Sequence, residues 1–241
     1  MTNNVSPAPI AHRPLILIAC MLAMFMSAIE ATIVATAMPT IIGDLGGFSL
    51  LGWVFAVYLL AQAITIPIYG RLADLYGRKR VFFFGATLFL LGSVLCGFAP
   101  DMYWLIGFRL LQGLGAGAIM PIASTIIGDI YSATERPKVM GYLSSVWGVS
   151  AIIGPLLGAF IVQHLPWALV FWVNLPIGLL AMFFLWRYLP AHQQLRRHAL
   201  DLAGTAWLTL FVSALLLALL QMVSLGWWLA PFLALAAASL A

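Results

Sequence analysis

Charged residues are scarce in this sequence. Asp, Glu, Lys and Arg make up 7% of the 241 residues, whereas an average soluble domain has about 25%. So few ionic groups cannot cover a globular surface in water, which excludes an ordinary water-soluble enzyme. Without a clustered basic patch, the net charge of +4 is not the footprint of a nucleic-acid-binding protein, and we expect no nucleic-acid partner.

Groups that would support catalysis or metal binding are also missing. The two cysteines, Cys20 and Cys96, and the four histidines show no metal-ligand spacing. The acids are scattered along the chain, and no nucleophile has a base beside it in the sequence. We therefore expect no metal, no cofactor and no enzymatic activity.

Hydrophobic residues are abundant, at 64% of the chain, and the mean hydropathy is +1.08. A bilayer core of about 30 Å needs about 20 apolar residues per helix, and windows of this length with one charge or none recur along the chain. The first window is too long for a signal peptide and contains Glu30, so we predict that it stays in the mature chain. The sequence predicts an all-α membrane protein with eight spans, at about 14–38, 50–69, 81–99, 103–128, 139–163, 167–189, 202–222 and from 226 onward.

The positions of the basic residues predict the orientation. When the spans are threaded alternately, ten of the eleven Lys and Arg residues fall on one side, and the loops on the other side have none. Because short cytoplasmic loops retain Lys and Arg, the basic side is predicted to be cytoplasmic. We therefore expect a multi-pass protein of the cytoplasmic (inner) membrane whose N-terminal segment, 1–13, and loop at 190–201 are cytoplasmic.

Two opposite charges, Glu30 and Arg109, fall inside predicted spans. Each costs about 2.5–3.5 kcal/mol at mid-bilayer, even on the mildest scale. At 1.5 Å of rise per residue, Glu30 lies about 13 Å and Arg109 about 10 Å below the outer ends of their helices, so the two share a level. We predict a proton-carrying acid beside a fixed cation in a water-filled cavity. The alternative is a structural ion pair, or two side chains that snorkel outward.

Small residues recur four apart on two of the spans. Gly113 and Gly117 share a face of the fourth span, and Gly154 and Gly158 share a face of the fifth. This spacing lets helices approach closely, and packing alone explains most of it. Pro155 removes a backbone donor and bends its helix, so we expect the fifth span to flex or to seal a cavity.

The loop predicted after the second span runs from Gly70 to Arg80. Retention of positive charge in the cytoplasm explains the basic residues of this loop, but it does not explain Asp74. It also does not explain Gly70 and Gly77, which we expect at the two ends of a tight connection. Asp74 and Arg78 are four residues apart. A local ion pair between them would act as a latch at the cytoplasmic mouth.

Three of these segments resemble signatures of the major facilitator superfamily. The loop is similar to the motif G-x-L-a-D-r-x-G-R-k-x at Gly70, Leu72, Ala73, Asp74, Gly77, Arg78 and Lys79. The fourth span resembles the motif R-x-x-Q-G-x-G-a at Arg109, Gln112, Gly113, Gly115 and Ala116. The fifth span resembles the antiporter motif g-x-x-x-G-P-x-x-G-G at Gly154, Pro155 and Gly158, with Ser150 and Ala159 in place of two glycines.

Two further segments are similar to the fourteen-helix drug/proton antiporters (EmrB/QacA type) of this family. Residues 30–39 resemble D-x-T-I-V-n-v-A-l-P, with Glu30 in place of Asp and Ala35 in place of Asn, and residues 172–178 resemble the beginning of the sixth helix. The resemblance implies a six-helix N-terminal bundle of 3+3 inverted repeats at 14–189. It also implies a pair of inserted helices at 202–241, the second of them truncated.

The resemblance further implies proton-coupled export of small amphipathic, often cationic compounds, with Glu30 as the proton carrier and Arg109 tuning it. The cytoplasmic gate would be formed by Gly70, Asp74, Gly77, Arg78, Asp129 and Arg136. The substrate cavity would be lined by Gln62, Gln112 and Asn174. Close packing of the fifth helix would use Gly154, Pro155 and Gly158.

The chain ends at Ala241, within an apolar run. A transporter that rocks two halves to alternate access needs a second helix bundle. We expect a truncated chain that lacks its C-terminal half. The alternatives are a half-transporter that pairs with a second copy and a fragment that inserts without transporting. The expected partners are the lipid bilayer, protons and a small-molecule substrate.

Overall fold

The computed structural model describes residues 12–190 and five isolated positions between 204 and 214. Apart from those positions, the inserted helix pair predicted at 202–241 lies outside the described residues. The same holds for nearly all of the predicted cytoplasmic segments 1–13 and 190–201.

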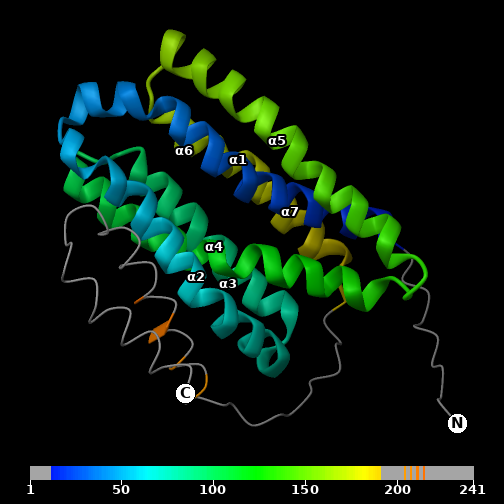
Figure 1. Cartoon of the computed structure of the whole chain (residues 1–241). Coiled ribbons are helices and arrows are strands. Elements are labelled where there is room, and N and C mark those ends of the chain that lie inside the picture. The colour runs from blue at the N-terminus through cyan, green and yellow to red at the C-terminus, as the bar shows by residue number, and fades with distance from the viewer. Residues whose placement is uncertain (1–11, 191–203, 205–206, 208–209, 212–213, 215–241) are drawn as a thin grey trace, which may run out of the picture.

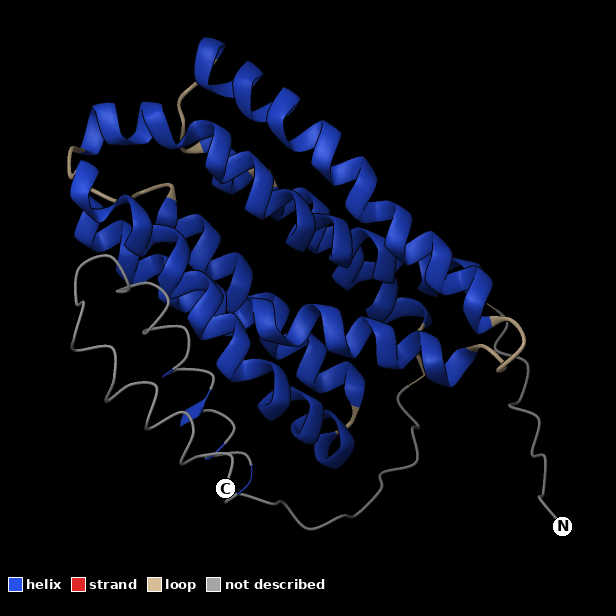
Figure 2. Ribbon diagram, viewed as in Figure 1, coloured by secondary structure: helices blue, strands red, loops and turns tan. Residues whose placement is uncertain are grey.

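The described chain is built of helices joined by short connections, as Figure 2 shows, and this part of the chain contains no strand. The elements are α1 (Arg13–Leu45), η1 (Phe48–Leu50), α2 (Leu51–Tyr76), α3 (Arg78–Cys96), α4 (Met102–Ile130), α5 (Arg136–His164), α6 (Leu169–Trp172) and α7 (Asn174–Tyr188). Six stretches are long and apolar enough to cross a membrane, with α6 and α7 forming one of them. The predictions of an all-α fold and of the first six spans are therefore confirmed for the described residues.

The helices extend beyond the predicted spans at several ends. Helix α1 continues through Pro39 to Leu45, and the chain then turns at two glycines, Gly46 and Gly47, that both have positive φ. Helix α4 begins after Asp101, whose carboxylate accepts hydrogen bonds from two backbone N–H groups of the first turn at 2.9 and 3.0 Å. Such a cap satisfies donors that have no partner within the helix, and so sets where α4 begins.

The prediction of a loop bounded by glycines at both ends was wrong for Gly70. Helix α2 runs through Gly70 to Tyr76, and the connection to α3 is the single residue Gly77. Gly77 has φ of 90°, a conformation that side chains disfavour, whereas Gly70 is helical. A lone glycine costs a helix only about 1 kcal/mol, so the helical turns on both sides carry α2 past this position.

The helices form two groups that lie side by side (Figure 1). Helix α1 packs most extensively against α5 and α7, and α4 packs most extensively against α2 and α3. Smaller contacts of α1 with α4 and of α3 with α7 join the groups. Helices that follow one another in the chain are thus not always neighbours, because α5 crosses over to α1.

Glycines mark the places where the helices approach most closely. A Cβ at Gly113 or Gly117 would collide with α2, and one at Gly154 would collide with the side chain of Thr32 on α1. A Cβ at Gly158 would also press on α1, 3.1 Å from the backbone oxygen of Ile33. The close approach predicted from the spacing of these glycines is therefore present, despite the replacements elsewhere in the antiporter motif.

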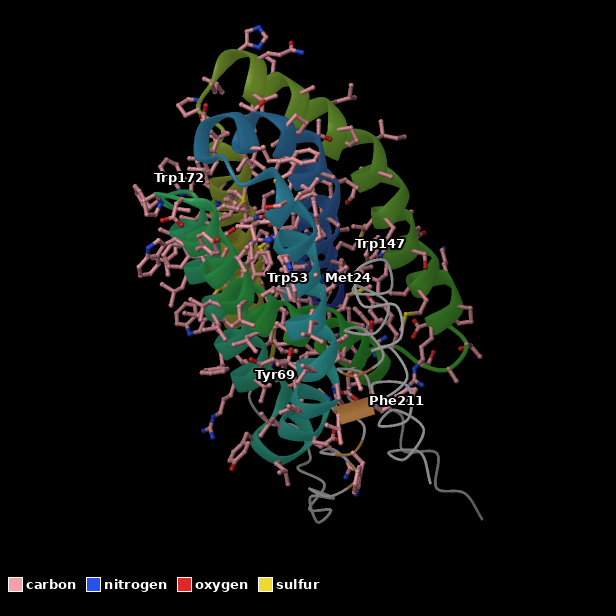
Figure 3. All side chains as sticks on the ribbon, turned by 60° about the vertical axis from the view of Figure 1, so that its left-hand side comes forward. Met24, Trp53, Tyr69, Trp147, Trp172 and Phe211 are labelled. Atoms are coloured by element: carbon pink, nitrogen blue, oxygen red, sulfur yellow. The ribbon has the colours of Figure 1, made fainter. Side chains whose placement is uncertain are left out.

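The buried hydrophobic core is divided into two clusters along the bundle. On α1, the first cluster ends at Met26 and the second begins at Ile29. Tyr69 belongs to the first cluster and Trp172 packs against the second, and Figure 3 shows these two residues toward opposite ends of the bundle. The level between the clusters is occupied by polar side chains.

Gly115 and Gly107 on α4 provide a matched test of this packing. A Cβ at Gly115 would collide with the backbone of Phe89 on α3, whereas a Cβ at Gly107 would meet nothing within 4 Å. We expect Gly115→Ala to lower the free energy of unfolding by about 1–3 kcal/mol, as overpacking does. Gly107→Ala should be neutral or stabilising by about 0.5–1 kcal/mol, because alanine favours the helix. Thermal unfolding in detergent measures both changes, and equal effects of the two variants would contradict this packing.

Candidate functional site

Five polar side chains from four helices meet at the level between the two core clusters. They form what we call the polar cluster, which consists of Glu30, Ser93, Arg109, Gln112 and Asn174. Each of the five is at most 1% exposed. Charged and amide groups this deeply buried in an apolar bundle must bond one another, because water and lipid offer them no partner.

Local helix geometry sets part of this arrangement. Arg109 and Gln112 are three residues apart on α4, so their side chains lie on one face, and Arg109 Nη1 donates to Gln112 Oε1 at 2.8 Å. Asn174 is the first residue of α7, one residue after the short helix α6 of the same span ends. Glu30 comes from the middle of α1 and Ser93 from the last turn of α3, and on both helices one core cluster gives way to the other at this level.

The carboxylate of Glu30 is held at both oxygens. Oε1 forms a salt bridge with Nη1 of Arg109, and Oε2 accepts a hydrogen bond from Nδ2 of Asn174. Counting residues along the helices predicts that Glu30 and Arg109 lie at one depth. In the structure the two side chains are in direct contact. Because both side chains are almost wholly enclosed, neither snorkels toward the membrane surface.

Arg109 has three further contacts that hold its guanidinium in place. Nη1 donates to Gln112, Nε donates to the backbone oxygen of Val54 at 3.4 Å, and Cζ lies 4.1 Å from the centre of the Tyr58 ring. A guanidinium over an aromatic face gains about 2 kcal/mol or more when both are desolvated. The cation therefore keeps several partners whatever the charge of Glu30.

Ser93 is the junction of the network. Its Oγ accepts hydrogen bonds from Gln112 Nε2 at 3.0 Å and from Asn174 Nδ2 at 2.9 Å, and it donates to the backbone oxygen of Phe171 at 2.9 Å. One hydroxyl thereby connects α3, α4 and the α6–α7 segment. Ser93 and Tyr58 are not among the residues predicted from the sequence. A single hydroxyl within an apolar span is the only sequence signal for either residue, and the partners that give them a role come from other helices.

The three residues predicted to line a substrate cavity are in different environments. Gln112 and Asn174 belong to the polar cluster and are fully buried. Gln62 is half-buried on α2, and its backbone oxygen accepts a hydrogen bond from Thr65 Oγ1 at 3.1 Å. Gln62 takes part in none of the bonds that define the polar cluster.

Most of the predicted gate residues lie on the side of the bundle where α2 and α4 end and α3 begins. Arg78, at the start of α3, forms an ion pair with Asp129 in the last turn of α4, and its Nη2 lies 3.8 Å from Asp74 Oδ1. Arg136 donates to backbone oxygens at the end of α4, those of Gly128 and of Tyr131, the latter at 3.1 Å. Arg78 thus joins the two acids, while Arg136 caps a helix end.

The connection between α4 and α5 is tied to the start of α1. Ser132 donates to Glu135 Oε2 from its backbone N–H at 3.0 Å and from its hydroxyl at 2.8 Å, and Arg13 Nη1 lies 3.6 Å from the same oxygen. The backbone N–H of Ser132, then its hydroxyl, and more weakly Arg13 hold the pKa of Glu135 below its usual range. These bonds favour the ionised form of the Glu135 carboxylate, so it stays charged to lower pH than a free glutamate.

Both cysteines are free, and they lie in different core clusters. Among the described residues, no group of three or more His, Cys, Asp and Glu side chains could hold a metal ion.

Comparisons with known proteins show what this chain is similar to. Residues 20–241 match the family described as the Major Facilitator Superfamily. Multidrug resistance protein 3 of Bacillus subtilis is 44% identical over 216 residues, which cover 90% of this chain and 42% of that protein. Multidrug transporter protein MdtP of the same organism is 44% identical over 209 residues, covering 87% of this chain and 39% of that protein. The chain thus spans about two fifths of the length of these relatives.

Solved structures share the fold at low sequence identity. The human organic anion transporter MFSD10 superposes with a TM-score of 0.68 at 18% identity, over 86% of this chain and 55% of that one. The POT family transporter PepTSo superposes with a TM-score of 0.66 at 17% identity, over 94% of this chain and 52% of that one. The family match, the relatives and the six membrane-length helices agree, and the chain belongs to the major facilitator superfamily, a family of membrane transporters and not of enzymes.

Proposed function

We propose that this chain works in a proton-coupled antiporter that exports small amphipathic compounds across the cytoplasmic membrane by alternating access. The observation that carries the proposal is the complete burial of the Glu30 carboxylate, in contact with Arg109, where four helices meet. An acid in this position changes the charge at the centre of the bundle whenever it binds or releases a proton. Ionisable groups inside a membrane protein commonly mark such ion pathways.

The contacts of the polar cluster allow protonation of Glu30 to change how the helices pack. Protonation of Glu30 removes its charge, so the attraction between α1 and α4 through Arg109 falls. Arg109 stays in place because Gln112, Val54 and the Tyr58 ring still hold it. The expected result is a looser contact of α1 with α4, which is one of the contacts that join the two groups of the bundle.

The 3+3 repeat proposed for this family's half-bundle fits the distribution of the two charges. If the first three spans form one repeat and the next three the other, Glu30 on α1 and Arg109 on α4 occupy the first helix of each. Sites at the interface of inverted repeats are typical of secondary transporters. We place the partner bundle for the rocking movement in a C-terminal half or in a second copy of the chain.

The substrate class is inferred from the relatives. Two proteins that are 44% identical to this chain are named as multidrug proteins, and an efflux pump of Gibberella fujikuroi is 38% identical over 164 residues. We propose a cavity with an apolar wall and a few polar groups, among them Gln62, Gln112 and Asn174. Close packing of α5 on α1 through Gly154 and Gly158 supports a role for the Pro155 segment in sealing this cavity.

The membrane orientation is part of the proposal. Threading the spans in the sequence predicts ten basic residues on the side where α2 ends and α3 begins, and we assign this side to the cytoplasm. The contacts of Arg78 with Asp129 and Asp74 then form a cytoplasmic gate that closes when α2, α3 and α4 come together at this end. Arg136 supports the gate by capping α4.

Glu30→Gln tests the proton-carrier role. The amide keeps the size of the side chain but cannot titrate, so we expect pH-driven efflux of ethidium from vesicles containing the complete transporter to fall to background. Because a neutral side chain at position 30 mimics a state of the cycle, the protein should stay folded. A purely structural ion pair predicts a loss of about 3–5 kcal/mol in the free energy of unfolding instead.

Asp44→Asn is the matched control for this variant. Asp44 lies on the same helix but is exposed near its end, so its loss removes one carboxylate without touching the polar cluster. We expect normal efflux from this control. Undiminished pH-driven efflux by Glu30→Gln would reject the proton-carrier role.

Asp74→Asn tests the gate. Arg78 keeps its ion pair with Asp129 in this variant but loses the weaker contact at 3.8 Å, so the closed gate should form less often. We expect the turnover rate to fall by about threefold to tenfold, in line with the worth of about 1 kcal/mol of a partly exposed ion pair, while the KM for ethidium changes little. A change confined to KM would place Asp74 in the substrate site and not in the gate.

A further inference from the structure

Helix α7 is attached at its first residue to the polar cluster. Asn174 Nδ2 donates to Glu30 Oε2 and, at 2.9 Å, to Ser93 Oγ. The hydrogen bond to Glu30 is strong while the acceptor is a carboxylate and weaker when it is a neutral acid, because an ionised acceptor roughly doubles the strength of such a bond. The hold of Glu30 on the beginning of α7 therefore depends on the protonation state of Glu30.

The other end of α7 is attached beside the gate. Lys79 Nζ donates to the backbone oxygens of Trp186 at 2.7 Å and of Leu189 at 2.8 Å. These oxygens belong to the last turn of α7 and the residue after it, where carbonyl groups lack partners within the helix and attract a cation. Lys79 follows Arg78 in the first turn of α3, so the end of α7 and the Arg78–Asp129 ion pair are fixed to the same turn.

Helix α7 continues the span that begins with α6, and Val173 between them keeps helical backbone angles. Helix α6 ends at Trp172 and α7 begins at Asn174, with Val173 between them. The residues before the break are bound to α3, since Trp172 Nε1 donates to the backbone oxygen of Val94 at 3.2 Å and Phe171 accepts from Ser93. Helix α7 is therefore a stiff rod that links the polar cluster at its first residue to the gate turn at its last.

We propose that α7 transmits the protonation state of Glu30 to the cytoplasmic gate, with Asn174 and Lys79 as the positioning residues at its two ends. This inference rests on the proposed function, because it requires that Glu30 takes up and releases a proton. The titratable groups that face Glu30 from the neighbouring helices are Arg109 on α4, Tyr58 on α2 and Cys96 on α3. Arg109 shares α4 with the gate acid Asp129, and α7 is the helix that is bonded to Glu30 through Asn174 and to the gate turn through Lys79.

Lys79→Met breaks the attachment at the gate and leaves the polar cluster untouched. Two fluxes of ethidium are measured in vesicles containing the complete transporter. One is uphill transport driven by a pH gradient, and the other is downhill transport with no pH gradient. We expect uphill transport to fall at least about tenfold, the factor that a hydrogen bond to a charged group is typically worth, and downhill transport to stay within about twofold. The gate then opens without regard to Glu30, so the substrate passes but is no longer coupled to protons.

Two variants control for charge and chemistry. Arg80→Met removes the same charge from the same turn, but Arg80 is exposed and, in the described part of the chain, shows no bond to α7. It should leave both fluxes unchanged. Lys79→Arg keeps a cationic donor and should restore most of the uphill transport. Unchanged uphill transport in Lys79→Met, an equal fall of both fluxes, or the same loss in Arg80→Met would each overturn the inference.

Combining the two ends tests whether they act through one helix. If Asn174→Ala and Lys79→Met both break the same link, the double variant should lose no more uphill transport than the worse single variant. Losses that multiply would overturn the inference, because they mean two independent effects. Glu30→Gln in the same assay separates the two proposals. Normal uphill transport by Glu30→Gln rejects the proposed function, whereas failure of the Lys79 variants alone rejects only the role of α7.

Discussion

The contact between Glu30 and Arg109 is the constraint on which the rest of the bundle depends. A single charge buried in an apolar medium costs several kcal/mol unless neighbouring groups bond to it. The bundle meets this cost with amide, hydroxyl and aromatic groups from four other positions, on α2, α3, α4 and α7. The polar layer therefore requires that these helices come close enough for short side chains to bridge them.

Small residues make this approach possible. Gly113 and Gly117 bring α4 against α2, and Gly92 lets α3 come so near that an added Cβ would lie 2.6 Å from the backbone of Gln112. Ser93 is the next residue, so the close approach at Gly92 puts its short hydroxyl within reach of α4. Gly113 contacts Tyr58 of the first core cluster and Gly158 contacts Ile33 of the second, so both clusters pack closely while the layer between them carries the charges. The same close approach of the helices thus provides both the tight apolar packing and the buried site that can change its charge.

Much of the fold and part of the polar cluster could be predicted from the sequence alone. The predictions that were wrong or missing have identifiable physical reasons. The six spans follow from hydropathy, and the common depth of Glu30 and Arg109 follows from counting residues along two helices. Gly70 was placed wrongly because a glycine in a basic segment looks like a turn, while the cost of one glycine is too small to stop a helix. Ser93 was missed because its partners lie 19 and 81 residues away in the chain.

By itself the sequence determined that the protein lies in a lipid bilayer, how many spans the described residues form, and that Glu30 and Arg109 lie at one depth. Each of these properties depends only on composition and on distance along a helix. Which helices touch was decided by the tertiary structure. The pairing of α5 with α1, the meeting of four helices at Ser93 and Arg109, and the attachment of α7 at both ends depend on contacts between distant segments. Periodicity along one helix shows which face is small or polar, but the partner of that face is selected by how the complementary surfaces of all the helices pack together.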